Sequence, residues 1–330
     1  MASTTPTTTP SSNKKEIVAE VPPYIRVFSD GTVERSIQIP FVPPLLDDPK
    51  TGISSKDIII SPNPPISARI YLPKLTNEKE KLPILVYFHG GSFFLGSPFS
   101  QWFHDYINSY LAPQGKFMVV SVDYRLAPEN PLPACYHDSW DALKWVASHA
   151  DNKTIIQAEP WLIENGDFDK VFIGGDSAGA NIAHNMAMRA GAEALPGNVR
   201  VVGAFLCHPF FYGSEDVIDP ELDSAVLGWK FVYPSAASGI DNPMINPMGE
   251  GAPSLASLGC SKMIVCVAGK DQFKLRDPGV RYYEAVKNSG WDGRIELFEE
   301  AEEDHCYHVL QPHTQCAVKL NKLLASFIQQ

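Results

Sequence analysis

The sequence has no run of positive charge and no long hydrophobic stretch. It holds 27 Lys and Arg residues against 38 Asp and Glu, which gives a formal net charge of −11. Nucleic acids and anionic membranes are bound through clustered Lys and Arg, so neither is an expected partner. No apolar run approaches the roughly 20 residues of a membrane-spanning helix. We expect a small molecule as the partner, and a monomer or a weak dimer.

Motifs for metals and cofactors are absent as well. The 6 cysteines include no Cys-x-x-Cys pair, and the chain has no dinucleotide-binding glycine fingerprint, no Walker motif and no cluster of metal ligands. This cysteine usage fits free thiols in a reducing compartment better than a disulfide framework. The N-terminus also lacks the apolar core of a secretory signal. We therefore expect no cofactor, no bound metal and a cytoplasmic location.

Composition divides the chain into a short tail and one large folded part. Residues 1–15 are rich in Ser, Thr and Pro, and we expect residues 1–21 to be a disordered tail. Beyond it no internal repeat and no interdomain linker is visible, and α/β folds often exceed the usual length of one domain. We therefore expect residues 22–330 to form a single domain.

Apolar segments typical of strands alternate with segments typical of helices. The expected strands are 56–61, 66–72, 82–88, 117–122, 171–173, 201–206, 262–268 and 294–298, and the expected helices are 139–150, 178–189, 280–289 and 315–328. Such alternation predicts a mostly parallel sheet with helices on both faces. Ligands of these folds bind at the carboxyl ends of the strands.

The most informative motif is Gly175-Asp176-Ser177-Ala178-Gly179, which follows an apolar strand and precedes a helix-forming segment. Two glycines around a serine allow a sharp strand-to-helix turn that exposes the serine hydroxyl. The same string can occur in an ordinary tight loop. Its position between a strand and a helix favours Ser177 as a nucleophile.

A second motif, His89-Gly90-Gly91, follows the strand expected at 82–88. Acyl transfer places negative charge on the former carbonyl oxygen, and backbone N–H groups held in advance stabilise that charge. Glycines let the backbone approach a substrate closely. We expect the N–H groups of Gly90, Gly91 and Ala178 to form this oxyanion hole, although a Gly-Gly pair after a strand is also a common turn.

A serine nucleophile needs a base, and the base needs a carboxylate that orients it. In hydrolases with this kind of turn the chain order is serine, acid, histidine. Asp271 follows the strand expected at 262–268, and His305 follows a later strand and an acidic loop. His308, three residues further on, is a rival base. The remaining histidines near the motifs are expected to be structural: His89, His184 and His208, although His208 follows the strand expected at 201–206 and could border the pocket.

With these motifs the chain resembles the plant carboxylesterase family, in the hormone-sensitive-lipase-like group of α/β-hydrolases. The matching segments are residues 89–91, 123–129, 175–179, 242–247 and 303–305. The likeness runs from about Tyr24 to the C-terminus. It implies an α/β-hydrolase fold in which Ser177 is the nucleophile, His305 the base and Asp271 the acid. It also implies that Gly90, Gly91 and Ala178 line the oxyanion hole.

Two positions depart from the family pattern. Ser92 stands where the family usually has Gly or Ala, which makes the mouth of the oxyanion loop bulkier and more polar. The family usually spaces two aspartates as Asp-x-Leu-x-Asp, whereas the loop between Asp271 and Asp277 is two residues longer. Asp271 is the expected acid because it sits at the strand end, from which it can reach an imidazole. Asp277 remains the alternative.

Two segments that interrupt the alternation are expected to form a small lid, residues 22–44 and 210–247. Ser92, Phe93 and Phe210 follow strand ends and are expected to line the substrate pocket, although the two aromatic rings could equally belong to the core. An apolar, aromatic pocket would favour esters of small or aromatic acids over long acyl chains.

Three functions fit these observations. The first is a serine carboxylesterase that works through an acyl-enzyme on small or aromatic esters, including those of a plant specialised metabolite. The second is a lyase or cyclase, because relatives in this family catalyse eliminations and cycloadditions in specialised metabolism. The third is a hormone-binding receptor, since gibberellin receptors resemble the family but replace the histidine. The intact Ser177 and His305 favour hydrolysis, and His305 argues against a receptor.

Overall fold

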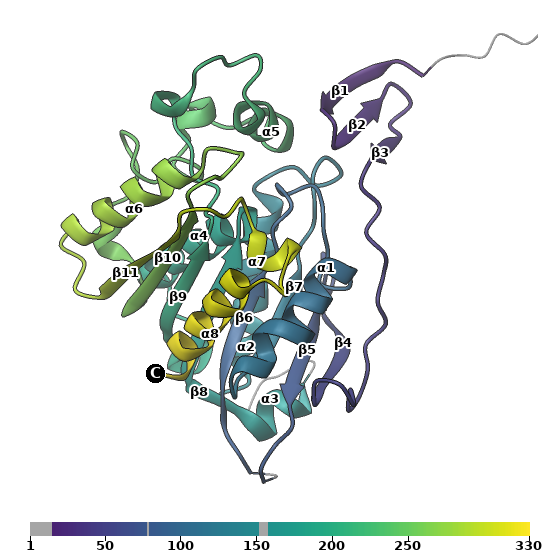
Figure 1. Cartoon of the computed structure of the whole chain (residues 1–330), viewed down its shortest axis with the longest axis vertical. Helices are drawn as coiled ribbons and strands as arrows, with labels where there is room; N and C mark the ends of the chain where they lie inside the picture. The colour runs from purple at the N-terminus through teal and green to yellow at the C-terminus, as the bar shows by residue number, and fades with distance from the viewer. Residues whose placement is uncertain (1–14, 78, 152–157) are drawn as a thin grey trace, which may run out of the picture. The chain divides into compact units, whose positions relative to one another are not determined.

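The main body of the protein is built on an eight-stranded sheet with the order β11-β10-β9-β8-β6-β7-β5-β4 (Figure 1). The computed structural model describes residues 15–77, 79–151 and 158–330. The strands of the sheet are β4 (Ile53–Pro62), β5 (Pro65–Pro73), β6 (Leu82–Phe88), β7 (Met118–Asp123), β8 (Gly166–Asp176), β9 (Val201–Cys207), β10 (Lys262–Ala268) and β11 (Arg294–Glu300). From β11 to β7 neighbouring strands pair in parallel, whereas β5 pairs antiparallel with β7 and with β4.

Helices connect these strands, and several of them pack on the sheet. They are α1 (Gln101–Asp105), α2 (Ala134–Ser148), α3 (Pro160–Asn165), α4 (Ala178–Ala192), α5 (Ser224–Val232), α6 (Arg276–Asn288), α7 (Tyr307–Leu310) and α8 (Gln315–Gln329), with a π-helical segment, η1 (Tyr106–Leu111), after α1. α4 packs against β8, β9 and α2, and α6 packs against β10 and β11. α8 packs against η1 and β6.

Residues of β8 show that α4 and α8 cover opposite faces of the sheet. The ring of Phe172 lies 5.9 Å from that of Phe327 in α8. A Cβ on Gly175 would lie 2.6 Å from the backbone of Gly179 in α4. Residues three positions apart in a strand point to opposite faces, so helices flank the sheet on both sides. Buried strands covered in this way explain the nearly continuous apolar runs of β6 and β10.

The order of strands and helices expected from the sequence is present, with boundaries that differ by a few residues. One difference has a clear cause. α6 begins at Arg276 rather than at residue 280, so that Pro278 and Gly279 lie in its first turn. Both residues disfavour a helix interior, but a proline in the first turn loses no hydrogen bond.

The expected disordered tail is wrong at its C-terminal end. Ile17–Val21 form β1, which pairs antiparallel with β2 (Ile25–Phe28), and β2 pairs with β3 (Val33–Arg35). These strands form a compact unit of their own that ends at Gln38, which the sequence did not indicate. Residues 1–14 of the predicted tail lie outside the described residues. The lid role expected for residues 22–44 stays a prediction.

Candidate active site

Parallel strands bring the predicted site residues to one edge of the sheet. Gly90 follows β6, Ser177 follows β8, His208 follows β9, Asp271 follows β10 and His305 follows β11. Because these neighbouring strands run in the same direction, their carboxyl ends lie along the same edge. Residues far apart in the sequence therefore meet in one place, where folds of this class bind their ligands.

The turn at Ser177 has the strained backbone of a nucleophile elbow. Ser177 adopts φ 53° and ψ −117°, which few non-glycine residues do, and it precedes the first residue of α4. A Cβ on Gly179 would lie 1.9 Å from the carbonyl oxygen of Phe88. The Ser177 N–H donates to the Cys207 carbonyl at 2.8 Å. Only a glycine at position 179 lets the start of α4 approach the end of β6 this closely. This contact and the hydrogen bond to Cys207 fix Ser177 at the end of β8.

The Asp271 carboxylate lies within hydrogen-bond distance of the His305 ring. Their Oδ2 and Nδ1 atoms are 2.7 Å apart, and the side chains are buried, with exposed fractions of 1% and 8%. A neutral imidazole that donates from Nδ1 keeps Nε2 free to accept a proton. The other Asp271 oxygen accepts the Phe273 N–H at 2.9 Å. The alternative acid Asp277 is 71% exposed and pairs with Arg276, so the geometry favours Asp271.

The rival histidines have other surroundings. His308 is buried in α7 and stacks on His208 with ring centroids 5.2 Å apart, and burial lowers the pKa of His308 to about 3. The His184 ring lies 2.8 Å from the Tyr282 hydroxyl, and burial lowers the pKa of His184 to about 3. Within the described residues neither ring contacts a carboxylate as His305 does.

Close backbone contacts shape the oxyanion loop. Gly91 has φ +107°, and a Cβ there would lie 2.2 Å from the carbonyl oxygen of Leu95. A Cβ on Gly90 would lie 2.3 Å from Oδ2 of Asp176. Ser92, the departure from the family pattern, also has a left-handed backbone, with φ 54°. The loop is therefore held in one conformation that a larger residue at either glycine would disturb.

The amide groups of this loop have different surroundings. The backbone amide of Gly90 interacts with the buried carboxylate of Asp176 and lowers its pKa. Within the part of the chain that the structure describes, the N–H groups of Gly91, Ser92 and Ala178 have no hydrogen-bond acceptor. These three are better suited than Gly90 to bind an oxyanion. Ser92 directly follows the two glycines but was not among the oxyanion donors predicted from the sequence.

Asp176 connects the loops that carry the candidate site, and sequence reasoning did not single it out. Its carboxylate accepts a hydrogen bond from the Tyr87 hydroxyl and lies 3.7 Å from the Cys306 thiol, beside His305. Burial raises the pKa of Asp176 to about 6, while Tyr87 and His305 lower it. The elbow, the oxyanion loop and the histidine loop thus meet at one buried carboxyl group. The middle position of a Gly-x-Ser motif gives no signal of such contacts.

The predicted pocket residues differ in their packing. Phe93 is fully buried, and its ring meets those of Phe210 and Trp229 edge-on at centroid distances of 6.0 and 6.3 Å. Phe93 is thus packed as a core residue. The Phe210 N–H donates to the Ser177 carbonyl at 3.1 Å, so Phe210 lies beside Ser177, and Ser92 is half-buried. Trp229 belongs to α5, so part of the expected lid segment 210–247 packs on the oxyanion loop.

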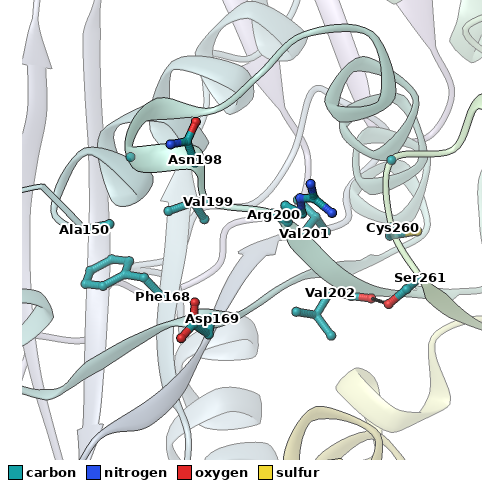
Figure 2. Close-up of a pocket in the computed structure, with 12 residues that line it drawn as sticks. Ala150, Phe168, Asp169, Asn198, Val199, Arg200, Val201, Val202, Cys260 and Ser261 are labelled. Carbon is teal, nitrogen blue, oxygen red and sulfur yellow. Dashed lines mark hydrogen bonds between the residues drawn. The ribbon is translucent and has the colours of Figure 1, made fainter.

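A large cavity lies at the other end of the sheet. Its volume is about 870 Å³, and the residues that line it include Asn198, Arg200 and Ser261 (Figure 2). These residues precede β9 and β10, so they lie at the amino ends of those strands. The cavity is therefore remote from Ser177 and is no part of the candidate active site.

Known proteins share both the fold and the length of this chain. The family model for the α/β-hydrolase fold matches residues 85–309. A 2-hydroxyisoflavanone dehydratase of Glycyrrhiza echinata is 54% identical, with 99% of this chain and 100% of the relative covered. A probable carboxylesterase of Arabidopsis thaliana is 41% identical, with 97% and 98% covered. The chain belongs to the plant carboxylesterase family.

Membership of this hormone-sensitive-lipase-like family makes the chain a carboxylic ester hydrolase by class and confirms the predicted α/β-hydrolase fold. A solved structure agrees. The hyperthermophilic esterase of the archaeon Pyrobaculum calidifontis has a TM-score of 0.66 and 30% identity, with 83% of this chain and 84% of that chain covered. In residues 15–77, 79–151 and 158–330, no helix combines the length and the apolar character needed to cross a membrane.

Proposed function

We propose that the protein is a serine carboxylesterase that hydrolyses small or aromatic esters through an acyl-enzyme. The proposal rests on the 2.7 Å hydrogen bond between Asp271 and His305, at the sheet edge where the elbow presents Ser177. A serine hydroxyl becomes a nucleophile when an oriented imidazole can take its proton. The aromatic surroundings of the nucleophile, including Phe210, favour a short or aromatic acyl group over a long chain.

In the first half-reaction the Ser177 oxygen attacks the ester carbonyl carbon, and its proton passes to Nε2 of His305. The carbonyl oxygen becomes negative and accepts hydrogen bonds from the N–H groups of Gly91, Ser92 and Ala178. Asp271 stabilises the imidazolium. The ester C–O bond then breaks, and His305 returns the proton to the leaving alcohol. In the second half-reaction water attacks the acyl-enzyme with His305 as base, which releases the acid and restores Ser177.

A second function, dehydration, is favoured by the 54% identity to a 2-hydroxyisoflavanone dehydratase. In such a substrate the C3 hydrogen is next to a ketone and is therefore acidic. We expect His305 to remove this proton while the oxyanion hole holds the enolate oxygen. The C2 hydroxyl then leaves as water with the proton from His305, and a C2–C3 double bond remains. No covalent bond to Ser177 forms.

One variant separates the two functions. Ser177→Ala should lower hydrolysis of p-nitrophenyl acetate by about 10⁶-fold, the loss seen when the serine of a triad is removed. The same variant should retain most of the dehydration of a 2-hydroxyisoflavanone, measured by mass spectrometry. His305→Ala should abolish both reactions, because both use the same base.

Covalent labelling tests the acyl-enzyme directly. A fluorophosphonate should add one phosphonyl group to the peptide that contains Ser177. An unchanged mass in folded protein, or full ester turnover by Ser177→Ala, would contradict the esterase mechanism. Failure to dehydrate the isoflavanone at high enzyme concentration would remove the second function.

A further inference from the structure

His208 places a third possible metal ligand beside the Asp271–His305 pair. One ligand atom from each of these three side chains lies within 4.8 Å of the other two. We propose that His208, Asp271 and His305 bind a divalent transition-metal ion, with Zn²⁺ as the reference case, and that the bound ion inhibits the enzyme. This site would switch the reaction off and takes no part in its chemistry.

The spacing of the three side chains suits a single ion. Because no two of the three atoms are more than 4.8 Å apart, an ion between them can lie within about 2.8 Å of each (at most 4.8 Å divided by √3). Zn–N and Zn–O bonds are about 2.0–2.2 Å long. Since 4.8 Å is the largest separation in the group, movements of less than about 1 Å bring all three atoms to bonding distance. Two imidazole nitrogens and a carboxylate oxygen are also the donor set that Zn²⁺ accepts in proteins.

An independent observation on His208 points to a ligand. Its side chain is 1% exposed, and neither ring nitrogen has a hydrogen-bond partner among the residues that the structure describes. Buried polar atoms in proteins are nearly always paired, so an imidazole with two unpaired nitrogens calls for a partner. The backbone of His208 is fixed as well, since its N–H donates to the Cys266 carbonyl at 2.7 Å. The ring is held 5.6 Å from that of His305, at an angle of 69°.

The bound ion would remove the catalytic base. This effect rests on the proposed mechanism, in which the His305 ring donates from Nδ1, 2.7 Å from Asp271, and accepts the proton of Ser177 at Nε2. An ion that coordinates Nδ1 uses the lone pair of that nitrogen, so the ring proton moves to Nε2. His305 can then take no proton from Ser177. The ion also occupies the Asp271 oxygen that would stabilise the imidazolium.

The test compares Zn²⁺ inhibition of p-nitrophenyl acetate hydrolysis in the wild type and in His208→Asn. Asn tolerates the left-handed backbone of this position, φ 49°. The half-inhibiting Zn²⁺ concentration should rise by roughly tenfold or more, since even outer partners of a metal site contribute tenfold to affinity. EDTA should restore wild-type activity. His137→Ala and His313→Ala remove exposed histidines, Cys316→Ser removes a half-exposed thiol, and all three should keep wild-type sensitivity.

Two further measurements do not depend on ester turnover. Addition of Co²⁺ to the wild type should give the strong visible absorption of an ion with four or five ligands, including nitrogen. Addition of Co²⁺ to His208→Asn should not. An anomalous difference peak at the zinc edge, in wild-type crystals soaked in Zn²⁺, should lie between His208 and His305, and this result needs no variant to fold. Equal Zn²⁺ sensitivity of the wild type and His208→Asn, or a zinc peak elsewhere, would overturn the site whether or not the esterase function holds.

Discussion

His305 and His308 are three positions apart in the sequence, but their side chains have different neighbours. His305 is paired with Asp271 at 2.7 Å. His308 stacks on His208, and burial lowers its pKa to about 3. A base must gain a proton in the transition state, and an oriented carboxylate is what stabilises the resulting charge. Only His305 has such a partner among the residues that the structure describes.

Replacing each histidine with alanine tests this assignment. His305→Ala should lower kcat on an activated ester by about 10⁶-fold, the loss seen when the histidine of a triad is removed. His308→Ala should lower kcat far less and should instead lower stability, because it leaves a cavity in the core. Circular dichroism checks the fold of both variants. A larger kcat loss in His308→Ala would move the base to His308.

Asp271 and Asp277 offer a second matched pair. Asp271→Asn should lower turnover by roughly 10⁴-fold with the fold intact, because the imidazole tautomer is no longer held. Asp277→Asn should have little effect, since Asp277 is 71% exposed and pairs only with Arg276 in the described contacts. Turnover of one activated ester by both variants decides between them. If both variants lose little turnover while Ser177 is essential, neither carboxylate contributes much to hydrolysis. That result would support the dehydratase function.

The lengthened acid loop shows which properties of single residues can be predicted from the sequence and which cannot. A carboxylate directly after an apolar strand was enough to indicate Asp271. The pattern could not show that Phe273, in the lengthened loop, would donate its N–H to Asp271 at 2.9 Å. It also could not identify His208 or Asp176, because their contacts come from neighbouring strands. The sequence predicts which residues lie at the ends of strands. The side chains that these residues contact depend on how neighbouring strands pack.

Among the structural elements, Gly91 of the oxyanion loop and Gly228 of α5 differ in what surrounds them. Gly91 has φ +107°, and an added Cβ would lie 2.2 Å from the Leu95 carbonyl oxygen. Gly228 lies inside α5, and an added Cβ there would have no atom within 4 Å. The first glycine is required by geometry, while the second only loosens a helix.

Alanine at each position should therefore have opposite effects. Gly91→Ala should lower both the melting temperature and ester turnover, because the left-handed backbone and the clash force the loop to move. Gly228→Ala should stabilise the protein by about 0.5–1 kcal/mol, the difference between the two residues in a helix interior. Thermal unfolding measures both effects. A stabilising Gly91→Ala would show that the loop has room to relax.

The burial of each element decided whether the sequence could predict it. β6 and β10 match their expected residues because continuous apolar runs of this length fit buried strands. β1 was missed although four of its five residues are apolar, because it was included in the tail that begins with the Ser-, Thr- and Pro-rich residues, and four of its five residues are exposed rather than buried in a core. α5, in the segment expected as a lid, interrupts the regular alternation and was likewise not predicted.

At the scale of the whole molecule, the buried Asp176 makes stability depend on pH. Its pKa is about 6 in the folded chain against an ordinary value of 3.8, so the folded chain holds this proton more tightly than the unfolded chain. The resulting stability is present below about pH 4 and is lost as the pH rises through 6. The difference corresponds to roughly 3 kcal/mol.

Asp176→Asn removes this titration. The unfolding free energy of the wild type minus that of the variant should fall as the pH rises from 4 to 7, by up to about 3 kcal/mol. Urea unfolding followed by tryptophan fluorescence at each pH gives both values. A difference that stays constant with pH would mean that Asp176 titrates alike in the folded and unfolded chains.

The loops of the site follow β6, β8, β10 and β11, so its parts leave the ribosome at widely separated times. Ser177 is synthesised long before His305, and a chain that stops before β11 has a nucleophile without a base. Parallel strands from distant parts of a chain also pair slowly, which keeps such intermediates exposed to aggregation. Ester turnover should then be among the last signals to appear in refolding, after tryptophan fluorescence has changed. Activity in this enzyme is therefore a measure of complete assembly of the sheet.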